Sequence, residues 1–224
     1  VYKRQHPDNV PVIEDWSHLL DGKVAVVTGG ADGIGKGISS LFAAHGAVVE
    51  IVDQNEALLK ETVEAIQAQG GKAHGFVADV RDADQVTEFK HEVMKRHATV
   101  DVLVNNVGDY RPLVRFLDSS PDSWKEMYDI NLHHVFLVTH AFLQLMIDSG
   151  GGSIINVHSV EGMRGYPGDP VYGAMKAAVN HFSTCLASGY GRNGIRGNGL
   201  GVDLTQTAQV CLLYTSDAAD DSLR

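Results

Sequence analysis

The sequence is poor in cysteine, in basic residues and in long apolar runs, and each shortage excludes a class of protein. Only two cysteines, Cys185 and Cys211, occur among 224 residues, and they lie in unrelated contexts. Neither a disulfide framework nor a zinc site can be read from them, and a reducing compartment is expected. No stretch reaches the roughly 18 apolar residues of a membrane span, and residues 1–7 lack the apolar core of a secretory signal. The sequence thus predicts a cytoplasmic protein.

The shortage of positive charge narrows the choice of partner. Acidic residues number 28 against 18 basic ones, which gives a formal net charge of -10, and the basic residues form no cluster. This argues against a nucleic-acid or anionic-membrane surface and favours a small-molecule partner. With 44% hydrophobic residues the chain is long enough to bury one sizeable core, so a single domain is expected.

Both ends of the chain look foreign to that domain. Val1–Gln5 can be encoded by GTG TAT AAG AGA CAG, and the reverse complement of this DNA, read one base in, encodes Cys211–Thr215. The shared DNA resembles a transposase-type library adapter. We therefore expect residues 6–210 to form the domain and residues 1–5 and 211–224 to be translated adapter. A natural acidic tail is the alternative for the second segment.

Short apolar runs alternate with amphipathic stretches along the chain. Lys23–Thr28 is a continuous apolar run closed by glycines, which is typical of a strand buried on both faces of a parallel sheet. Apolar residues then recur at helical spacing until Gly46. This alternation predicts an α/β fold of Rossmann type, a doubly wound parallel sheet in three α/β/α layers with a ligand crevice at the strands' carboxyl ends. Further strands are expected at 47–52, 72–78, 100–104, 153–158 and 195–200, and further helices at 55–69, 82–97, 121–148 and 172–190.

A glycine-rich loop joins the first strand to the first helix. It reads Thr28-Gly29-Gly30-Ala31-Asp32-Gly33-Ile34-Gly35. Glycines at such a place let the backbone approach a pyrophosphate, and the helix N-terminus offers unpaired N–H groups. A simple turn is the alternative. The strand–helix context favours a dinucleotide site.

The acidic residues around this loop favour NAD over NADP. Asp53 ends the second strand, where a carboxylate accepts hydrogen bonds from the ribose hydroxyls and repels a 2′-phosphate. Asp32 places a negative charge in the loop itself. A turn residue at a strand end is the plainer reading of Asp53.

Four further motifs, together with the loop, resemble those of the short-chain dehydrogenase/reductase family. They follow the family's order and spacing from about Gly22 to Asp203, and they are Asn105-Asn106-Val107-Gly108, Asn131, Ser159 and Tyr172-Gly-Ala-Met-Lys176. The resemblance implies a dehydrogenase that moves hydride between a nicotinamide and a secondary alcohol or ketone. It also implies a homodimer or homotetramer as the parent protein, and a domain cut off at Cys211 before its last helix and strand.

The resemblance assigns roles to individual residues. Tyr172 would be the proton-transfer acid/base, Lys176 would bind the nicotinamide ribose, Ser159 would hydrogen-bond the substrate oxygen, and Asn131 would hold a water. Tyr172 and Lys176 lie one helical turn apart, so both project onto one face. A nearby ammonium favours phenolate, so we expect Lys176 to bring the pKa of Tyr172 down from about 10. The family's cofactor contacts fall on Gly29, Asp32, Gly33, Ile34, Gly35, Asp53, Asp79, Val80, Asn105, Asn106, Gly108, Tyr172 and Lys176.

Plainer readings stay open for several of these residues. Ser159 can cap a loop, Asn131 can bond backbone within its helix, and Lys176 can be a solvated lysine. Asp79 can cap the next helix. The eleven histidines are scattered and suggest no metal ligand set.

Two loops that border the expected substrate space carry Arg111 and Arg164. Each arginine can meet a polar group of the substrate or pair with a nearby acid. The stretch Gly201–Thr205 departs from the Pro-Gly turn usual in the family, which puts the carboxamide contact in doubt. One alternative to a dehydrogenase is a dinucleotide-binding fragment without turnover. An epimerase or dehydratase on the same scaffold is less favoured, because those relatives usually have a differently spaced glycine loop.

Overall fold

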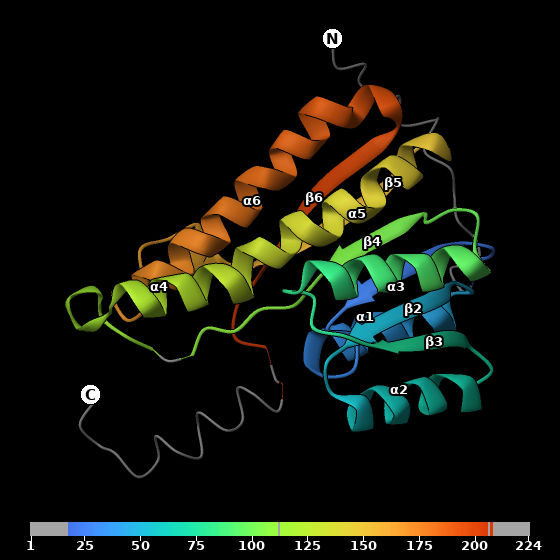
Figure 1. Cartoon of the computed structure of the whole chain (residues 1–224), viewed down its shortest axis with the longest axis horizontal. Helices are drawn as coiled ribbons and strands as arrows, with labels where there is room; N and C mark the ends of the chain where they lie inside the picture. The colour runs from blue at the N-terminus through green and yellow to red at the C-terminus, as the bar shows by residue number, and fades with distance from the viewer. Residues whose placement is uncertain (1–17, 112, 206, 208–224) are drawn as a thin grey trace, which may run out of the picture.

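A single parallel sheet forms the centre of the protein. The computed structural model describes residues 18–111, 113–205 and 207. Its six strands are ordered β3-β2-β1-β4-β5-β6, and every neighbouring pair is parallel (Figure 1). This order is that of the doubly wound Rossmann-type sheet, so the predicted fold class is confirmed. The segments assigned to adapter, 1–5 and 211–224, lie outside the described residues. The strands are β1 (Val24–Thr28), β2 (Val48–Asp53), β3 (Lys72–Val77), β4 (Val102–Asn105), β5 (Gly152–Ser159) and β6 (Ile195–Val202).

Helices cover both faces of the sheet and bury two apolar clusters. One cluster packs the sheet against α3 and α5 and contains Phe89 and Phe142, both fully buried. The other packs it against α1 and α2 and contains Leu59 and Ile66. The three-layer arrangement follows from strands that are apolar on both sides. The helices are α1 (Gly33–Ala44), α2 (Glu56–Ala68), α3 (Ala83–Arg96), α4 (Pro121–Tyr128), α5 (His134–Asp148) and α6 (Pro170–Tyr190), with short 3₁₀ turns η2 (Phe116–Asp118), η4 (Val160–Gly162) and η5 (Gly191–Asn193).

The stretch predicted as one helix over 121–148 contains a change of helix type. Between α4 and α5 the backbone forms a π-helical turn, η3 (Asp129–His133). Ser120 caps the start of α4, where its hydroxyl accepts a hydrogen bond from Ser123 N at 3.3 Å. Hydrophobic periodicity does not detect one widened turn, whereas such turns are frequent at functional sites. Asn131 lies inside this turn.

The same stretch is long and apolar enough to span a membrane by length and composition. Over 28 residues its best window reaches a mean hydropathy of 1.4, with 44% of that window buried in the protein. Val138, Phe142 and Met146 are fully buried in the cluster against the sheet. Packing in the core therefore accounts for much of its apolar character.

Helix α6 begins two residues earlier than predicted, at Pro170 instead of Tyr172. Asp169 is its N-cap, and its carboxylate accepts a hydrogen bond from the backbone N–H of Tyr172 at 3.2 Å. Proline at the first helical position and aspartate before it are a standard helix start.

The glycines of β6 bring α6 close to the sheet. A Cβ at Gly197 would lie 2.6 Å from the carbonyl oxygen of Ser183, and one at Gly199 would lie 2.9 Å from the Asn180 side chain. Both neighbours belong to α6. Gly197 and Gly199 lower the strand propensity of residues 195–200, but they also allow α6 to pack closely on the sheet.

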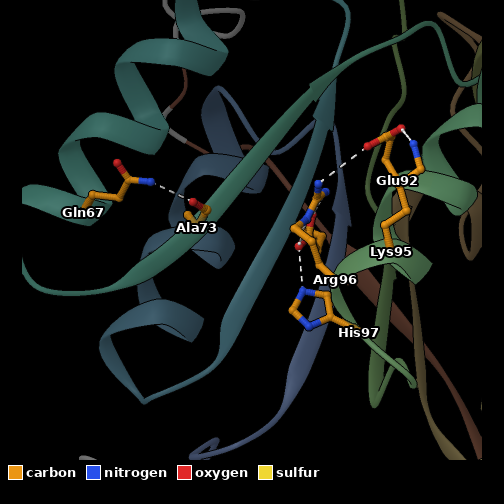
Figure 2. A network of polar contacts seen from close by, with 7 residues as sticks. Gln67, Ala73, Glu92, Lys95, Arg96 and His97 are labelled. Carbon is orange, nitrogen blue, oxygen red and sulfur yellow. Dashed lines mark hydrogen bonds and ion pairs between the residues drawn. The ribbon is translucent and has the colours of Figure 1, made fainter.

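A buried carboxylate ties the end of α3 to the sheet. Glu50 lies in the middle of β2, is 1% exposed, and accepts hydrogen bonds from Arg96 at 3.0 and 2.6 Å. The His97 ring lies 2.7 Å from the same carboxylate. Figure 2 shows Arg96 and His97 side by side, with Arg96 also reaching towards Glu92 on the outer surface of the helix. Arg96 and His97 thus compensate the negative charge that Glu50 buries in the sheet.

Removing the positive charge of Arg96 should lower the free energy of unfolding more than removing the carboxylate of Glu50. Arg96→Met leaves Glu50 buried with only His97 as a partner, and we expect it to lower the free energy of unfolding by about 3 kcal/mol. Glu50→Val should cost less, because Arg96 is 31% exposed and can reach water. Lys95→Met, in an exposed pair with Glu92, is the control and should change it by less than about 0.5 kcal/mol. Urea unfolding of the three variants measures the order, and an Arg96→Met change as small as the control would contradict it.

Candidate functional site

One cavity lies at the carboxyl ends of the strands, where the fold predicts a ligand. Its volume is about 640 Å³. Loops that follow β1, β2, β3, β4, β5 and β6 contribute to it, so residues far apart in sequence meet there. The predicted residues that line it are Gly29, Asp32, Gly33, Ile34, Asp53, Asp79, Val80, Asn106, Gly108, Ser159, Tyr172 and Lys176. Gly35, Asn105 and Asn131 lie behind this lining.

The loop after β1 requires glycine at two of its positions. Gly29 has a φ of 59°, in the left-handed region, and at Gly35 a Cβ would lie 2.0 Å from the Gly29 carbonyl oxygen. Asp32 caps α1 by accepting a hydrogen bond from Gly33 N at 2.7 Å. The N-terminus of α1 therefore opens on the cavity beneath a loop without bulky side chains. This cradle fits a dinucleotide pyrophosphate.

Carboxylates surround the part of the cavity next to that loop. The two oxygens of Asp53 accept hydrogen bonds from Ala31 N at 3.2 Å and from Asn55 N at 3.0 Å, which fixes the end of β2 against the loop. Asp79 is paired with Arg81 through two contacts of 2.9 and 2.6 Å, and these bonds hold the pKa of Asp79 below its usual value. The plainer reading of Asp79 as a helix cap is wrong, because Asp82 caps α3.

The loop after β4 is fastened to the loop after β1. The Asn106 side chain donates hydrogen bonds to the carbonyl oxygens of Thr28 and Gly29 at 3.0 and 3.1 Å, and its backbone N–H donates to the Thr28 hydroxyl. Asn105 instead points into the core, where it donates to Thr139 and Asn156. Of the two asparagines, Asn106 lines the cavity and Asn105 supports the strand.

Tyr172 and Ser159 meet on the opposite side of the cavity. Both side chains line the cavity, where the Ser159 hydroxyl acts to lower the pKa of Tyr172, and the Ser159 oxygen accepts a hydrogen bond from Glu161 N at 3.2 Å. Ser159 therefore caps the η4 turn, as the plainer reading proposed, and also faces Tyr172. The Tyr110 ring lies against Tyr172 edge-on, with 6.3 Å between ring centroids.

Lys176 is buried rather than solvated. It is 4% exposed, and its amine lies 5.6 Å from the centre of the Tyr172 ring. A Cβ at Gly108 would lie 2.5 Å from this amine and 3.0 Å from the amide oxygen of Asn131. A Cβ at this position would displace the lysine amine, and the amide of Asn131 reaches the same point.

Asn131 joins the π turn to the loop after β4. Its amide group donates to the carbonyl oxygen of Asp109 at 2.7 Å and accepts from Asp109 N at 3.1 Å. It also donates to Met127 O within its own helical segment at 3.2 Å, as the plainer reading proposed. Asn131 thus holds the loop that carries Gly108.

Burial, and not the neighbouring lysine, dominates the proton affinity of Tyr172. Desolvation raises the pKa of Tyr172 to about 12, although the hydrogen bond from Ser159 acts in the opposite direction. Desolvation also lowers the pKa of Lys176 to about 8. The expectation that Lys176 brings the Tyr172 pKa below 10 is therefore wrong for this structure, because desolvation of the buried phenol is the dominant effect on its pKa.

The two arginines of the substrate loops are paired with nearby acids. Arg111 donates to both oxygens of Asp109, at 3.1 and 2.8 Å. Arg164 donates to Glu161 at 3.0 Å and lies 3.6 Å from Asp203. All of them line the cavity, so its outer part carries compensated charge.

Sequence reasoning missed Asp169 as part of this site, whereas Tyr110 lies in a loop that was expected to border the substrate. Asp169 is 3% exposed and lines the cavity, and burial raises its pKa to about 6. The aspartate–proline pair before the helix signals a cap, but not a side chain that also faces a ligand space. Within the described part of the chain, no group of three or more metal-ligating side chains occurs.

Comparison with known proteins gives one consistent family. The family described as short chain dehydrogenase matches residues 23–212. A 3-oxoacyl-[acyl-carrier-protein] reductase of Thermotoga maritima is 37% identical over 190 residues, which are 84% of this chain and 76% of the relative. The structure of a 7α-hydroxysteroid dehydrogenase complexed with NADH has a TM-score of 0.83 at 29% identity, and the match covers 88% of this chain and 76% of that chain. L-sorbose reductase from Gluconobacter frateurii, complexed with NADPH, has a TM-score of 0.86 at 25% identity, with 92% and 78% covered.

Two glycines of the same segment provide a matched test of the cradle. Gly35→Ala should abolish binding of NADH and NADPH, because its Cβ would collide with the Gly29 carbonyl. Gly37→Ala, in the interior of α1 with nothing within 4 Å of its Cβ, should leave binding unchanged and raise the free energy of unfolding by about 1 kcal/mol. Dinucleotide fluorescence titration and urea unfolding measure both effects. Tight binding by a folded Gly35→Ala variant would exclude the cradle.

Proposed function

We propose that this chain, which belongs to the short-chain dehydrogenase family, is an NAD(H)-dependent oxidoreductase that interconverts a secondary alcohol and its ketone. The proposal is carried by the meeting of Tyr172, Ser159 and the Lys176 amine in one cavity with the glycine cradle. A hydroxyl pair beside a dinucleotide site is the arrangement that proton transfer to a carbonyl oxygen requires.

The dinucleotide would lie along the loop after β1, held by Gly29, Gly33 and the N-terminus of α1. When bound, it supplies the hydride acceptor or donor at the nicotinamide ring. The protein's contribution is then to place the substrate oxygen and to move one proton.

Tyr172 is the proton donor and acceptor in this proposal. Because its pKa lies at about 12, the phenol keeps its proton at neutral pH and is ready to protonate a ketone oxygen. In the oxidation direction the phenol has to lose its proton first, so alcohol oxidation should become faster as the pH rises. Ser159 donates its hydrogen bond to the phenol oxygen or to the substrate oxygen, and so favours the anionic form of either.

Lys176 and Asn131 support Tyr172 from behind. The buried amine lies at the inner side of the phenol ring, and the Asn131 amide is adjacent to it across Gly108. An amine whose pKa is about 8 can release and take up a proton near neutral pH, so it suits a relay between the phenol and the interior of the site.

The preference for NAD rests on the charge around the ribose end of the cavity. Asp53, Asp32 and Asp79 line it, and Arg81 is engaged by Asp79. A 2′-phosphate would meet negative charge at this end of the cavity. Among the described residues that line the cavity, the cations are the paired Arg111 and Arg164 and, at the other end, Lys176.

Two broader features are also proposed. A cytoplasmic location is supported by the exposed, unpaired Cys185, which suits a reducing compartment. A homo-oligomer is supported by the apolar outer surface of α5 and α6, where Phe136 packs on Phe182 at 4.9 Å and is 37% exposed.

Replacing the phenol tests the catalytic assignment. Tyr172→Phe should lower ketone reduction by about 10²- to 10⁴-fold, because no other group takes over proton transfer, while NADH binding stays intact. Absorbance at 340 nm and NADH fluorescence measure the two quantities. Tyr190→Phe, at the exposed end of α6, is the control. Unchanged reduction in the Tyr172 variant would disprove the role, as would wild-type alcohol oxidation that fails to rise between pH 7 and pH 10.

Replacing one carboxylate tests the cofactor preference. Asp53→Asn keeps an acceptor for the Ala31 N–H but removes the negative charge, so the ratio of NADH to NADPH affinity should fall by roughly tenfold. Glu126→Gln, exposed on α4, should leave the ratio unchanged. A wild-type preference for NADPH would overturn the proposal.

A further inference from the structure

Three polar atoms beside Tyr172 have no hydrogen-bond partner. Among the described residues, the buried side-chain atoms without one include Glu161 Oε2, Asp169 Oδ2 and the Tyr110 hydroxyl. All three residues line the same cavity as Tyr172 and Ser159. Buried polar atoms in native proteins are nearly always paired, and an unpaired one next to a ligand space indicates a ligand group as the missing partner.

The two carboxylates are held rigidly next to the reacting hydroxyls. Asp169 caps α6 and accepts from the N–H of Tyr172, while the N–H of Glu161 donates to Ser159. The turn that carries Glu161 is packed tightly on α6, since a Cβ at Gly173 would lie 2.9 Å from the Glu161 carbonyl oxygen. Each free oxygen therefore has a fixed place relative to Tyr172.

Charge decides what kind of group fits these oxygens. Glu161 already has Arg164 at 3.0 Å, and Arg111 is engaged by Asp109, so an anionic substrate finds acids and no unpaired arginine. Asp169 forms no ion pair in the described part of the chain, and its other oxygen is taken by the helix cap. A hydroxyl group can donate to the free oxygen of either carboxylate without placing a further charge in a cavity that already holds Lys176 and the paired arginines.

We infer that Asp169 and Glu161 form a subsite that accepts a hydrogen bond from a second hydroxyl group of the substrate, next to the alcohol or ketone carbon that reacts. The substrate class is accordingly a neutral polyol or hydroxyketone. This inference rests on the proposed function for its geometry, because Tyr172 defines where the reacting oxygen lies. Tyr110 closes the same space with its ring against Tyr172.

Two alcohols with one carbon skeleton separate the contribution of the second hydroxyl. The wild-type enzyme should oxidise 2,3-butanediol with a kcat/KM at least roughly tenfold above that for 2-butanol, the usual discrimination from a hydrogen bond to a charged acceptor. Asp169→Asn keeps an oxygen for the helix cap and replaces the free acceptor by an N–H donor. It should bring the ratio of kcat/KM for the diol to kcat/KM for 2-butanol close to one. Glu126→Gln is the control for loss of one acidic charge.

Binding separates failure of this subsite from failure of the proposed function. The diol should change the fluorescence of the enzyme–NADH complex at lower concentration than 2-butanol does, and Asp169→Asn should abolish that difference. Selective diol binding without turnover of either alcohol would support the subsite and defeat the oxidoreductase proposal. Equal binding and equal kcat/KM for the two alcohols, an unchanged preference in Asp169→Asn, or stronger binding of 3-amino-2-butanol or 3-hydroxybutyrate than of the diol would overturn the inference.

Discussion

The burial of the Lys176 amine against Gly108 is the constraint on which the site depends. A lysine amine that is almost completely removed from water is costly, so the structure around it has to be closed and well fixed. Three segments meet there: the loop after β4, the π turn with Asn131, and α6 with Tyr172. A side chain at position 108 would displace the Lys176 amine and crowd the Asn131 amide oxygen. The position of the phenol is thus determined by backbone packing as much as by its own contacts.

The fold could be predicted from the sequence because its strands are buried on both sides. Runs such as Val24–Thr28 have no polar face, and only a parallel sheet covered by two helical layers buries them. The errors lie where tertiary packing or capping overrides the pattern. Asp169 moves the start of α6 to Pro170, and the π turn interrupts a helix whose apolar spacing looks continuous.

The candidate site was only partly accessible to the same reasoning. Glycines and the Tyr172–Lys176 pair are local signals, and the structure brings them to one cavity. Ion pairs and hydrogen bonds between elements that are distant in the sequence leave no such local signal. The sequence shows that Glu50 interrupts an apolar strand, but not that Arg96 compensates it, and it gives no sign that Asp169 has a free oxygen. The proton affinity of Tyr172 depends on burial, which a motif does not report.

The π-helical turn at Asp129–His133 lies between a part of the helical segment that packs on the sheet, α5, and a part that borders the site, α4. A π turn contains one residue more than the α-helical path needs, so the halves before and after it differ in phase by about 100° from a regular helix. Downstream of the turn, Val138 and Phe142 pack in the cluster against the sheet, while within the turn the Asn131 amide donates to the Asp109 carbonyl oxygen. Loss of a single codon in this stretch would restore an ordinary helix and uncouple the two halves. The rotational phase between α4 and α5, rather than any one side chain, therefore connects the packing of this segment on the sheet with the position of Asn131 in the site.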